Sequence, residues 1–221
     1  GGELMIVSED VLLSTARANV DISGSVNGGS MQLHADNHNL AAGTFKADGD
    51  SGKGGAIDFA GKNVRLAAAN ISAKGSTHGG KVRIGGEYLG GQQLSTVSQK
   101  EYDGFINRFD NQNNIINAQK TIVDYDVNIN ISSEFGQGGA AVIWSDETTD
   151  FMGSIIANGY LSADKDLITM VSSNKTKGGF IEISSKDLLR TVLLDRVDVD
   201  YGTLLLDPKN ITVDASGSSG G

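Results

Sequence analysis

The chain has 221 residues, which is enough for one large β domain or two ordinary domains. It contains 30 glycines and no cysteine, so a disulfide framework is excluded, and the lack of a Gly-X-Y period excludes a collagen helix. Acidic residues outnumber basic ones by 27 to 18, and the formal charge of −9 disfavours nucleic acid and anionic lipid as direct partners. No apolar run approaches the roughly 18 residues that a membrane span needs, so we expect no direct membrane insertion.

Glycine doublets divide the chain into repeats. They begin at residues 1–2, 28–29, 54–55 and 79–80, and they return at 138–139 and 178–179. The second and fourth residues after each doublet are apolar in all six repeats: Leu4/Ile6, Met31/Leu33, Ile57/Phe59, Val82/Ile84, Ala141/Ile143 and Ile181/Ile183. Four of the six residues between these pairs are polar. This period-two alternation predicts a β-strand after each doublet, with the apolar pair on the core face.

A repeat of about 25 residues that carries strands and no helical stripe is typical of a solenoid. One repeat cannot bury its own apolar face, whereas stacked repeats bury one another's and pair their backbones about 4.8 Å apart. We expect glycine at the corners because it accepts positive φ. Asparagine–aliphatic pairs such as Asn70-Ile71 and Asn128-Ile129 place amides that can stack into ladders. The sequence therefore predicts an all-β fold, a right-handed parallel β-helix, over residues 1–221 as one segment of a longer protein.

Two stretches interrupt the repeat. Residues 92–120 contain no glycine doublet and many amides, and they predict an insertion from one coil of the β-helix, with a short helix around residues 103–109. Residues 160–173 carry further aliphatic side chains and predict a smaller insertion. The fold is therefore expected to carry one or two segments outside the regular coils.

From about Gly79 onward the chain resembles filamentous haemagglutinin-type exoproteins, the secreted partners of bacterial two-partner secretion. Three stretches carry this resemblance: GGKVRIGGEY at 79–88, GGAAVIWSDETT at 138–149 and GTLLLDPKNITV at 202–213. The resemblance implies a β-helical shaft that is threaded through an outer-membrane transporter partner and ends as a secreted or cell-surface protein. Members of this family act as adhesins, biofilm matrix proteins, haemolysins or stalks that deliver toxins.

Candidate catalytic groups are sparse. Parallel β-helices also carry polysaccharide lyases and hydrolases, whose chemistry needs clustered carboxylates with a metal or a basic residue. The pairs Asp124/Asp126 and Asp198/Asp200 each share a strand face, but Val197 and Val199 alternate with the second pair as core residues. His34 and His38 follow a strand and enter a turn, where a spacing of four does not bring their rings together. We therefore expect no catalytic residues, no metal site and no cofactor, and we predict that the protein is not an enzyme.

Trp144 is the most informative single residue. Because Ala141 and Ile143 point inward, Val142 and Trp144 point outward, and an exposed tryptophan beside an exposed valine is unusual on a soluble rod. One interpretation is that an insertion folds over this face and buries it. The other is that Trp144 forms a platform for sugar rings, with further contacts from the insertion. The candidate ligand-binding residues on that interpretation are Trp144, Tyr102, Phe105, Phe109 and Asn111.

The sequence as a whole favours a structural or adhesive role. We expect a β-helical segment of a secreted bacterial surface exoprotein that mediates or supports attachment to host cells, surfaces or biofilm polysaccharide. Its expected partners are the outer-membrane transporter and a carbohydrate or host-cell-surface ligand. Two alternatives stay open: the stalk of a contact-dependent toxin-delivery exoprotein and, in a different class, a β-helical polysaccharide lyase or hydrolase.

Overall fold

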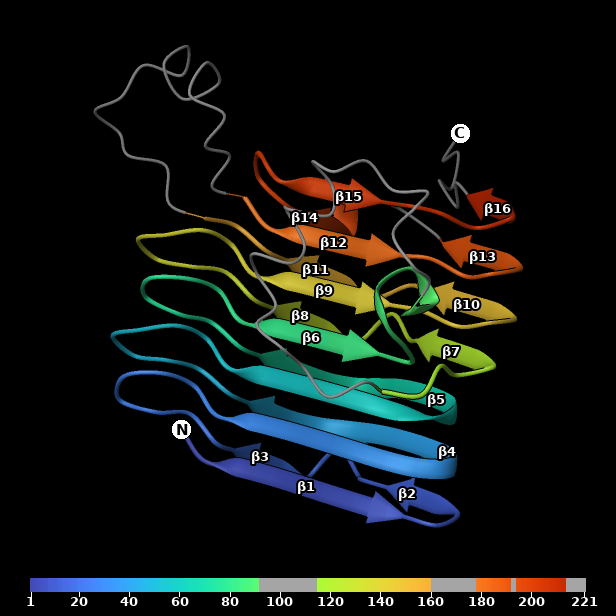
Figure 1. Cartoon of the computed structure of the whole chain (residues 1–221), viewed down its shortest axis with the longest axis horizontal. Coiled ribbons are helices and arrows are strands. Elements are labelled where there is room, and N and C mark those ends of the chain that lie inside the picture. Colours follow the sequence, from blue (N-terminus) through green and yellow to red (C-terminus); the bar gives the residue numbers. More distant parts are fainter. Residues whose placement is uncertain (92–114, 160–177, 192–193, 214–221) are drawn as a thin grey trace, which may run out of the picture.

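The computed structural model describes residues 1–91, 115–159, 178–191 and 194–213. Of the described residues, 54% lie in strands and 4% in helices, so the all-β expectation is confirmed. Within the described residues sixteen strands form one sheet that curls as a half-barrel, and each of their pairings is parallel (Figure 1). No helix among these residues is long and apolar enough to cross a membrane.

The strands are short except for two. Their bounds are β1 (Glu3–Ser8), β2 (Val11–Leu13), β3 (Asn19–Asp21), β4 (Ser30–Lys46), β5 (Ala56–Ser72), β6 (Lys81–Ile84), β7 (Lys120–Val123), β8 (Asn128–Asn130), β9 (Ala140–Ile143), β10 (Thr148–Phe151), β11 (Ser154–Ile156), β12 (Phe180–Ile183), β13 (Leu188–Thr191), β14 (Val197–Asp198), β15 (Thr203–Leu205) and β16 (Asn210–Val213). Two short 3-10 helices, η1 (Tyr88–Gly91) and η3 (Leu194–Arg196), complete the described elements.

The strands stack in three columns, and each repeat contributes to the same columns in the same order. The first column contains β1, the starts of β4 and β5, β6, β9, β12 and β15. The second contains β2, the middles of β4 and β5, β7, β10, β13 and β16. The third contains β3, the ends of β4 and β5, β8, β11 and β14. The long strands β4 and β5 run through all three columns and bend between them.

The register of the first column agrees with the predicted repeat. Leu4 pairs with Met31, and the same row continues through Ile57, Val82, Ala141, Ile181 and Leu204. Ten of the twelve apolar positions that follow the glycine doublets belong to the main buried cluster. Leu4 is only partly buried and Ile6 is 38% exposed, because both lie in the first repeat, where β1 pairs with β4 alone.

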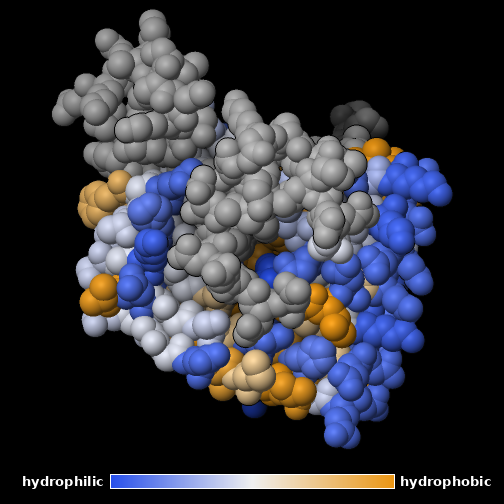
Figure 2. Space-filling model, in the orientation of Figure 1, coloured by the Kyte–Doolittle hydropathy of each residue, from blue (hydrophilic) through white to orange (hydrophobic). Residues whose placement is uncertain are grey.

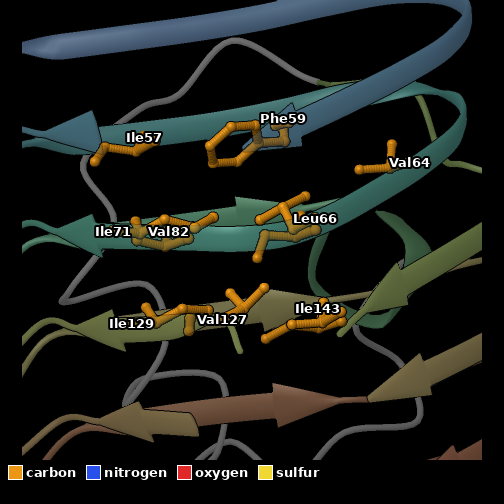
Figure 3. Packing of buried hydrophobic residues seen from close by; sticks show 14 of the residues in the cluster. Ile57, Phe59, Val64, Leu66, Ile71, Val82, Val127, Ile129 and Ile143 are labelled. Atoms are coloured by element: carbon orange, nitrogen blue, oxygen red, sulfur yellow. The ribbon is translucent and has the colours of Figure 1, made fainter. Parts of the chain in front are cut away.

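The core lies between the columns and is made of stacked aliphatic rows. Figure 3 shows side chains from different repeats pointing toward one another between the ribbons; those labelled are Ile57, Phe59, Val64, Leu66, Ile71, Val82, Val127, Ile129 and Ile143. Phe45 and Phe59 meet edge to face with ring centroids 5.1 Å apart. Full burial of a side chain of this size stabilises the fold by about 1.5–3 kcal/mol. Each repeat added to the stack therefore adds buried side chains to the core and stabilises the fold further.

The glycine doublets lie where the third column ends and the first begins. The N–H of Gly55 donates to the carbonyl of Ala47, and the N–H of Gly80 donates to the carbonyl of Ala73. Among the described glycines, positive φ occurs only at Gly43, Gly61, Gly85, Gly90 and Gly91. The expectation that the doublets serve through positive φ is therefore wrong.

The doublets are required by close backbone packing instead. A Cβ on Gly54 would lie 2.1 Å from the Ala73 carbonyl oxygen, and a Cβ on Gly138 would lie 1.9 Å from that of Ala157. No side chain larger than hydrogen fits at such distances. The corner is thus a place where the backbones of neighbouring repeats meet without intervening side chains.

An asparagine ladder runs along the third column, as the Asn–aliphatic pairs predicted. The Asn128 Nδ2 donates to Asn70 Oδ1 at 3.3 Å. Ser154 Oγ donates to Asn128 Oδ1 at 2.8 Å and extends the ladder by one repeat. These side chains satisfy one another along the stack while Ile71 and Ile129 point into the core.

The chain leaves the regular stack between β6 and β7. The N–H of Ala118 donates to the carbonyl of Gly85 at 2.6 Å, so the points of departure and return lie together. Lys120, the last residue of the predicted insertion 92–120, is the first residue of β7. Residues 92–114, with the helix predicted at 103–109, lie outside the described residues, as does the whole predicted insertion 160–173.

The outer surface differs between the columns. Figure 2 shows hydrophilic residues along the right side, where the second column lies, and an apolar strip along the lower edge. The exposed apolar side chains of the first repeat include Met5, Val7, Val11 and Leu13. Strands β1 and β2 therefore carry apolar side chains on both faces, whereas the exposed residues of β3 are polar.

A matched pair of glycine substitutions tests the packing of the corners. Gly55→Ala would place a Cβ 2.0 Å from the Gly29 carbonyl oxygen, whereas a Cβ at Gly2, the same doublet position in the first repeat, meets nothing within 4 Å. We expect Gly55→Ala to lower the free energy of unfolding by about 1–3 kcal/mol or more. Gly2→Ala should leave it nearly unchanged. Urea denaturation followed by far-UV circular dichroism measures both, and equal effects would contradict the packing explanation.

Candidate functional site

A second buried cluster lies on the outward side of the first column. Ala141 and Ile143 of β9 point into the main core, as predicted, whereas Val142 and Trp144 belong to this second cluster. Its members are Tyr88, Leu89, Ala140, Val142, Trp144 and Phe180, with Leu205 packed against it. We call this outward side of β6, β9 and β12 the covered face, and residues 86–91 with 115–117 the strap. Figure 1 shows the first part of the strap, in green after β6, near the end of β9.

Trp144 is enclosed by the strap and is 3% exposed. A Cβ on Gly90 would lie 2.5 Å from the indole Cζ2, so the strap backbone rests directly on the ring. Leu89 and Gly90 have φ of 49° and 65°, which turns the chain sharply over the indole. The indole Nε1–H donates to Asp146 Oδ1 at 3.1 Å. Asn117 Nδ2 donates to the Gly90 carbonyl at 2.9 Å and holds the turn in place.

This arrangement decides between the two interpretations of Trp144. Its side chain points outward as predicted, and its burial agrees with the interpretation in which this face is covered. Tyr88 and Leu89, which cover it, precede the predicted insertion. The other candidate ligand-binding residues, Tyr102, Phe105, Phe109 and Asn111, lie outside the described residues.

Arg83 joins both parts of the strap to the sheet. Its Nε and Nη2 donate to the two carboxylate oxygens of Asp58 at 2.9 and 2.7 Å, and its Nη1 donates to Glu87. The same oxygen of Glu87 accepts the N–H of Ile115 at 2.8 Å. Burial opposes the charge on Arg83, but hydrogen bonds and attraction from Asp58 and Glu87 outweigh it and raise the pKa of the guanidinium. A fully charged network is thus buried beneath the strap.

Glu182 is the other buried acid of the covered face. It is 0% exposed, and the N–H of Leu89 donates to its Oε2 and Oε1 at 3.0 and 3.3 Å. Burial raises the pKa of Glu182 to about 8, against the opposing hydrogen bonds from Leu89 and Ser184, and the charge of Asp207 adds to the rise. At neutral pH the carboxyl is therefore mostly protonated. A buried carboxyl with a raised pKa is a feature of many functional sites.

The paired aspartates do not form an acid pair. Asp124 forms an ion pair with Arg65, with 2.7 Å between Oδ2 and Nη2. Asp126 instead accepts a hydrogen bond from the N–H of Ala68, a residue with φ of 48°. Asp198 accepts the N–H of Asp200 at 3.0 Å. Val197 and Val199 pack against the core, as predicted. Asp124, Asp126 and Asp198 therefore each have a structural partner, whereas burial and the charge of Asp198 raise the pKa of Asp200.

The histidines are dispersed over the surface. A ring nitrogen of His34 lies 2.9 Å from Asp36, and His38 and His78 are exposed. Within the described part of the chain, no group of three or more histidine or acidic side chains could hold a metal ion.

A polar groove of about 640 Å³ follows the stacked glycine doublets. Its floor consists of the doublets themselves. One wall is the in-register row Glu3, Ser30, Ala56 and Lys81, and the other contains Lys53, His78 and Gln137, whose backbones are linked by parallel bridges. On the left of Figure 2, a column of hydrophilic side chains stands beside pale surface.

Sequence reasoning missed this groove, although a signal was present. The residue immediately before each doublet is polar in the repeats that reach the groove, namely Asn27, Lys53, His78 and Gln137. Only the stacking of the repeats turns three of these separated positions, Lys53, His78 and Gln137, into one wall. The interpretation of both candidate sites rests on this geometry, because the sequence matches no protein-family model, no curated protein and no solved structure.

Two arginine pairs with the same fork geometry test the buried network. Arg83 and Asp58 are 2% and 7% exposed, whereas Arg190, which holds Asp150 through Nε and Nη2 at 2.6 and 3.0 Å, is 52% exposed. We expect Arg83→Met to cost about 3–5 kcal/mol of stability, because it leaves buried carboxylates unpaired. Arg190→Met should cost less, because water reaches the half-exposed guanidinium of this pair even though Asp150 is only 12% exposed. Thermal and urea unfolding of both variants measure the difference, and similar losses would argue against the role of burial.

Proposed function

We propose that this chain is a segment of a right-handed parallel β-helix from a secreted bacterial surface exoprotein of the filamentous haemagglutinin type. Its role is structural and adhesive: it mediates or supports attachment to host cells, surfaces or biofilm polysaccharide. The observation that supports this most is the in-register stacking of successive repeats in three parallel columns. Such a stack extends by adding repeats, and each repeat needs only its neighbours to bury its core.

The composition supports export through an outer-membrane transporter partner. The chain contains no cysteine, so no disulfide forms that would obstruct threading of the unfolded chain. Its excess of acidic residues keeps an extended surface soluble. We therefore place the protein at the cell surface or outside the cell.

The polar groove is the part of the described surface that best fits an extended polysaccharide. It crosses five repeats, and at about 4.8 Å between neighbouring repeats it offers a track of roughly 15–20 Å. The side chains of Lys53, His78, Gln137 and Ser30 supply hydrogen-bonding groups for hydroxyls along that track. The floor lacks side chains, so a flat sugar chain could lie directly on the backbone. Trp144, in contrast, is covered by the strap.

Blocking the groove tests this proposal. Ser30→Tyr puts a large side chain on the groove wall at an exposed strand position, and His38→Tyr puts the same side chain at an exposed position of the same strand, in the second column. Both positions tolerate an aromatic residue in a strand. On arrays of linear polysaccharides we expect the wild type and His38→Tyr to bind with similar affinity. Ser30→Tyr should bind at least about tenfold more weakly than the wild type.

The outcomes of that experiment separate the possible functions. Equal binding by all three proteins would rule out the groove as the site, and no binding by the wild type would contradict an adhesive role and leave a supporting one. Turnover of pectin- or alginate-like polymers, with or without calcium, would overturn the proposal in favour of a polysaccharide lyase or hydrolase. The candidate acids argue against turnover, because Asp124, Asp126 and Asp198 are held by structural partners and Glu182 is enclosed beneath the strap.

Trp144→Ala gives an independent check on where a ligand binds. Since Trp144 packs beneath the strap, we expect its loss to lower stability by about 3–5 kcal/mol. Polysaccharide binding by the folded variant should equal that of the wild type. A folded variant that had lost binding would point to the covered face as the ligand site.

A further inference from the structure

The covered face is closed by two attachments of different chemistry. Arg83 holds Glu87 and, through it, Ile115, by charged contacts. Glu182 holds the turn at Leu89 by accepting its N–H. We propose that the turn at Tyr88–Gly91 is an acid-held cover: the protonated carboxyl of Glu182 keeps it seated on Trp144, and loss of that proton releases it while the sheet stays intact.

The surroundings of Glu182 make its ionised form unfavourable while the cover is closed. Its register neighbours on the two adjoining strands are Val142 and Leu205, which are both apolar. The N–H of Leu89 is the strap group that contacts the carboxyl, and Ser184, the residue that follows β12, also hydrogen-bonds to it. A buried carboxylate with so few donors is costly, and opening the cover lets water reach it.

The other charged groups around the covered face do not relieve this cost. Asp207 repels a charge on Glu182. Glu87 and Asp58 are paired with Arg83 on β6, two strands away from β12, and Lys81, the other cation of this face, is also on β6. Asp146 accepts the indole N–H of Trp144. Loss of the proton from Glu182 therefore adds an unpaired negative charge beneath the turn.

The direction of the pH effect follows from linkage. The pKa of Glu182 is about 8 with the cover closed, against 4.5 for the ordinary side chain, so the closed state binds the proton more tightly. Raising the pH between these values lowers the ratio of closed to open by about tenfold per pH unit. Above the higher value both states are ionised and the ratio no longer changes. Below the lower value Glu182 is protonated in both states, and its full contribution to closing the cover is present.

The release is local because the remaining attachments do not depend on this proton. Arg83 continues to hold Glu87 and Asp58 as charged partners. The main core lies on the other side of the first column, where Ile181 and Ile183 of β12 are buried. The part freed is thus the turn that covers Trp144, Val142 and Phe180.

Trp144 is the only tryptophan of the chain, so its fluorescence reports on the cover without labelling. Acrylamide quenching and the emission maximum are measured from about pH 5 to pH 9.5, beside far-UV circular dichroism. We expect quenching to rise and the emission to shift to longer wavelength as the pH approaches 8, with no loss of strand signal. Simultaneous loss of the strand signal would overturn the proposal, because Trp144 would then report unfolding of the sheet.

Three variants make the test specific. Glu182→Gln keeps an acceptor for the Leu89 N–H but cannot ionise, so its fluorescence should not change over this range; the same transition as in the wild type would overturn the proposal. Glu134→Gln removes one carboxylate at an exposed position and should behave as the wild type. Asp207→Asn, also at an exposed position, should leave a larger fraction of the cover closed above pH 8, because it removes a charge that repels the ionised Glu182 beneath the closed cover. An unchanged fraction there would contradict the assignment to Glu182, even if Glu182→Gln failed to fold.

Discussion

The structure depends on backbone pairing between equivalent residues of successive repeats. Parallel strands in register bring each residue about 4.8 Å from its counterpart in the next repeat. The apolar rows, the Asn70–Asn128–Ser154 ladder and the glycine corners are consequences of this one constraint. This constraint is most severe at the glycine corners, because two backbones meet there and a single methyl group would collide with a carbonyl oxygen. The sequence must therefore repeat residue types at fixed positions, which is why the repeat is visible without an alignment.

The first column could be predicted because its inward positions are uniformly apolar. The second column was hidden, since its inward row contains Asn39, Thr121 and Thr149, which interrupt any apolar alternation. These polar side chains are fully buried and bond to backbone carbonyls near the bends: Asn39 to Leu33 and Ala60, Thr121 to Trp144, and Thr149 to Ser184. A bend interrupts the regular strand pairing, and a buried amide or hydroxyl satisfies the carbonyls left there. Pattern reasoning treats such residues as surface residues and so misses the strand.

The covered face was predicted in part for a related reason. Alternation places Val142, Trp144, Arg83 and Glu182 on the outward side, and their strands do point them there. Alternation cannot tell whether an outward side chain meets water or another segment. The strap comes from residues 86–91 and 115–117, and its contacts with Trp144 and Glu182 span large separations in sequence. Polar residues between apolar ones consequently predict direction, whereas their burial depends on tertiary contacts that the local sequence does not encode.

The Arg83 network and Glu182 show two ways in which charged groups can be enclosed on the outside of a sheet. Around Arg83 the charges are kept and neutralised by pairing, so the network holds while its carboxylates are ionised. At Glu182 no cation is provided by its register neighbours, and the charge is removed by protonation instead. A charged attachment and a neutral one thus hold the same short strap, and the fold separates a permanent anchor from a point that responds to pH. Because the residues that line the groove over the glycine doublets include neither acid, we expect the proposed ligand binding there to be independent of the proposed movement of the strap.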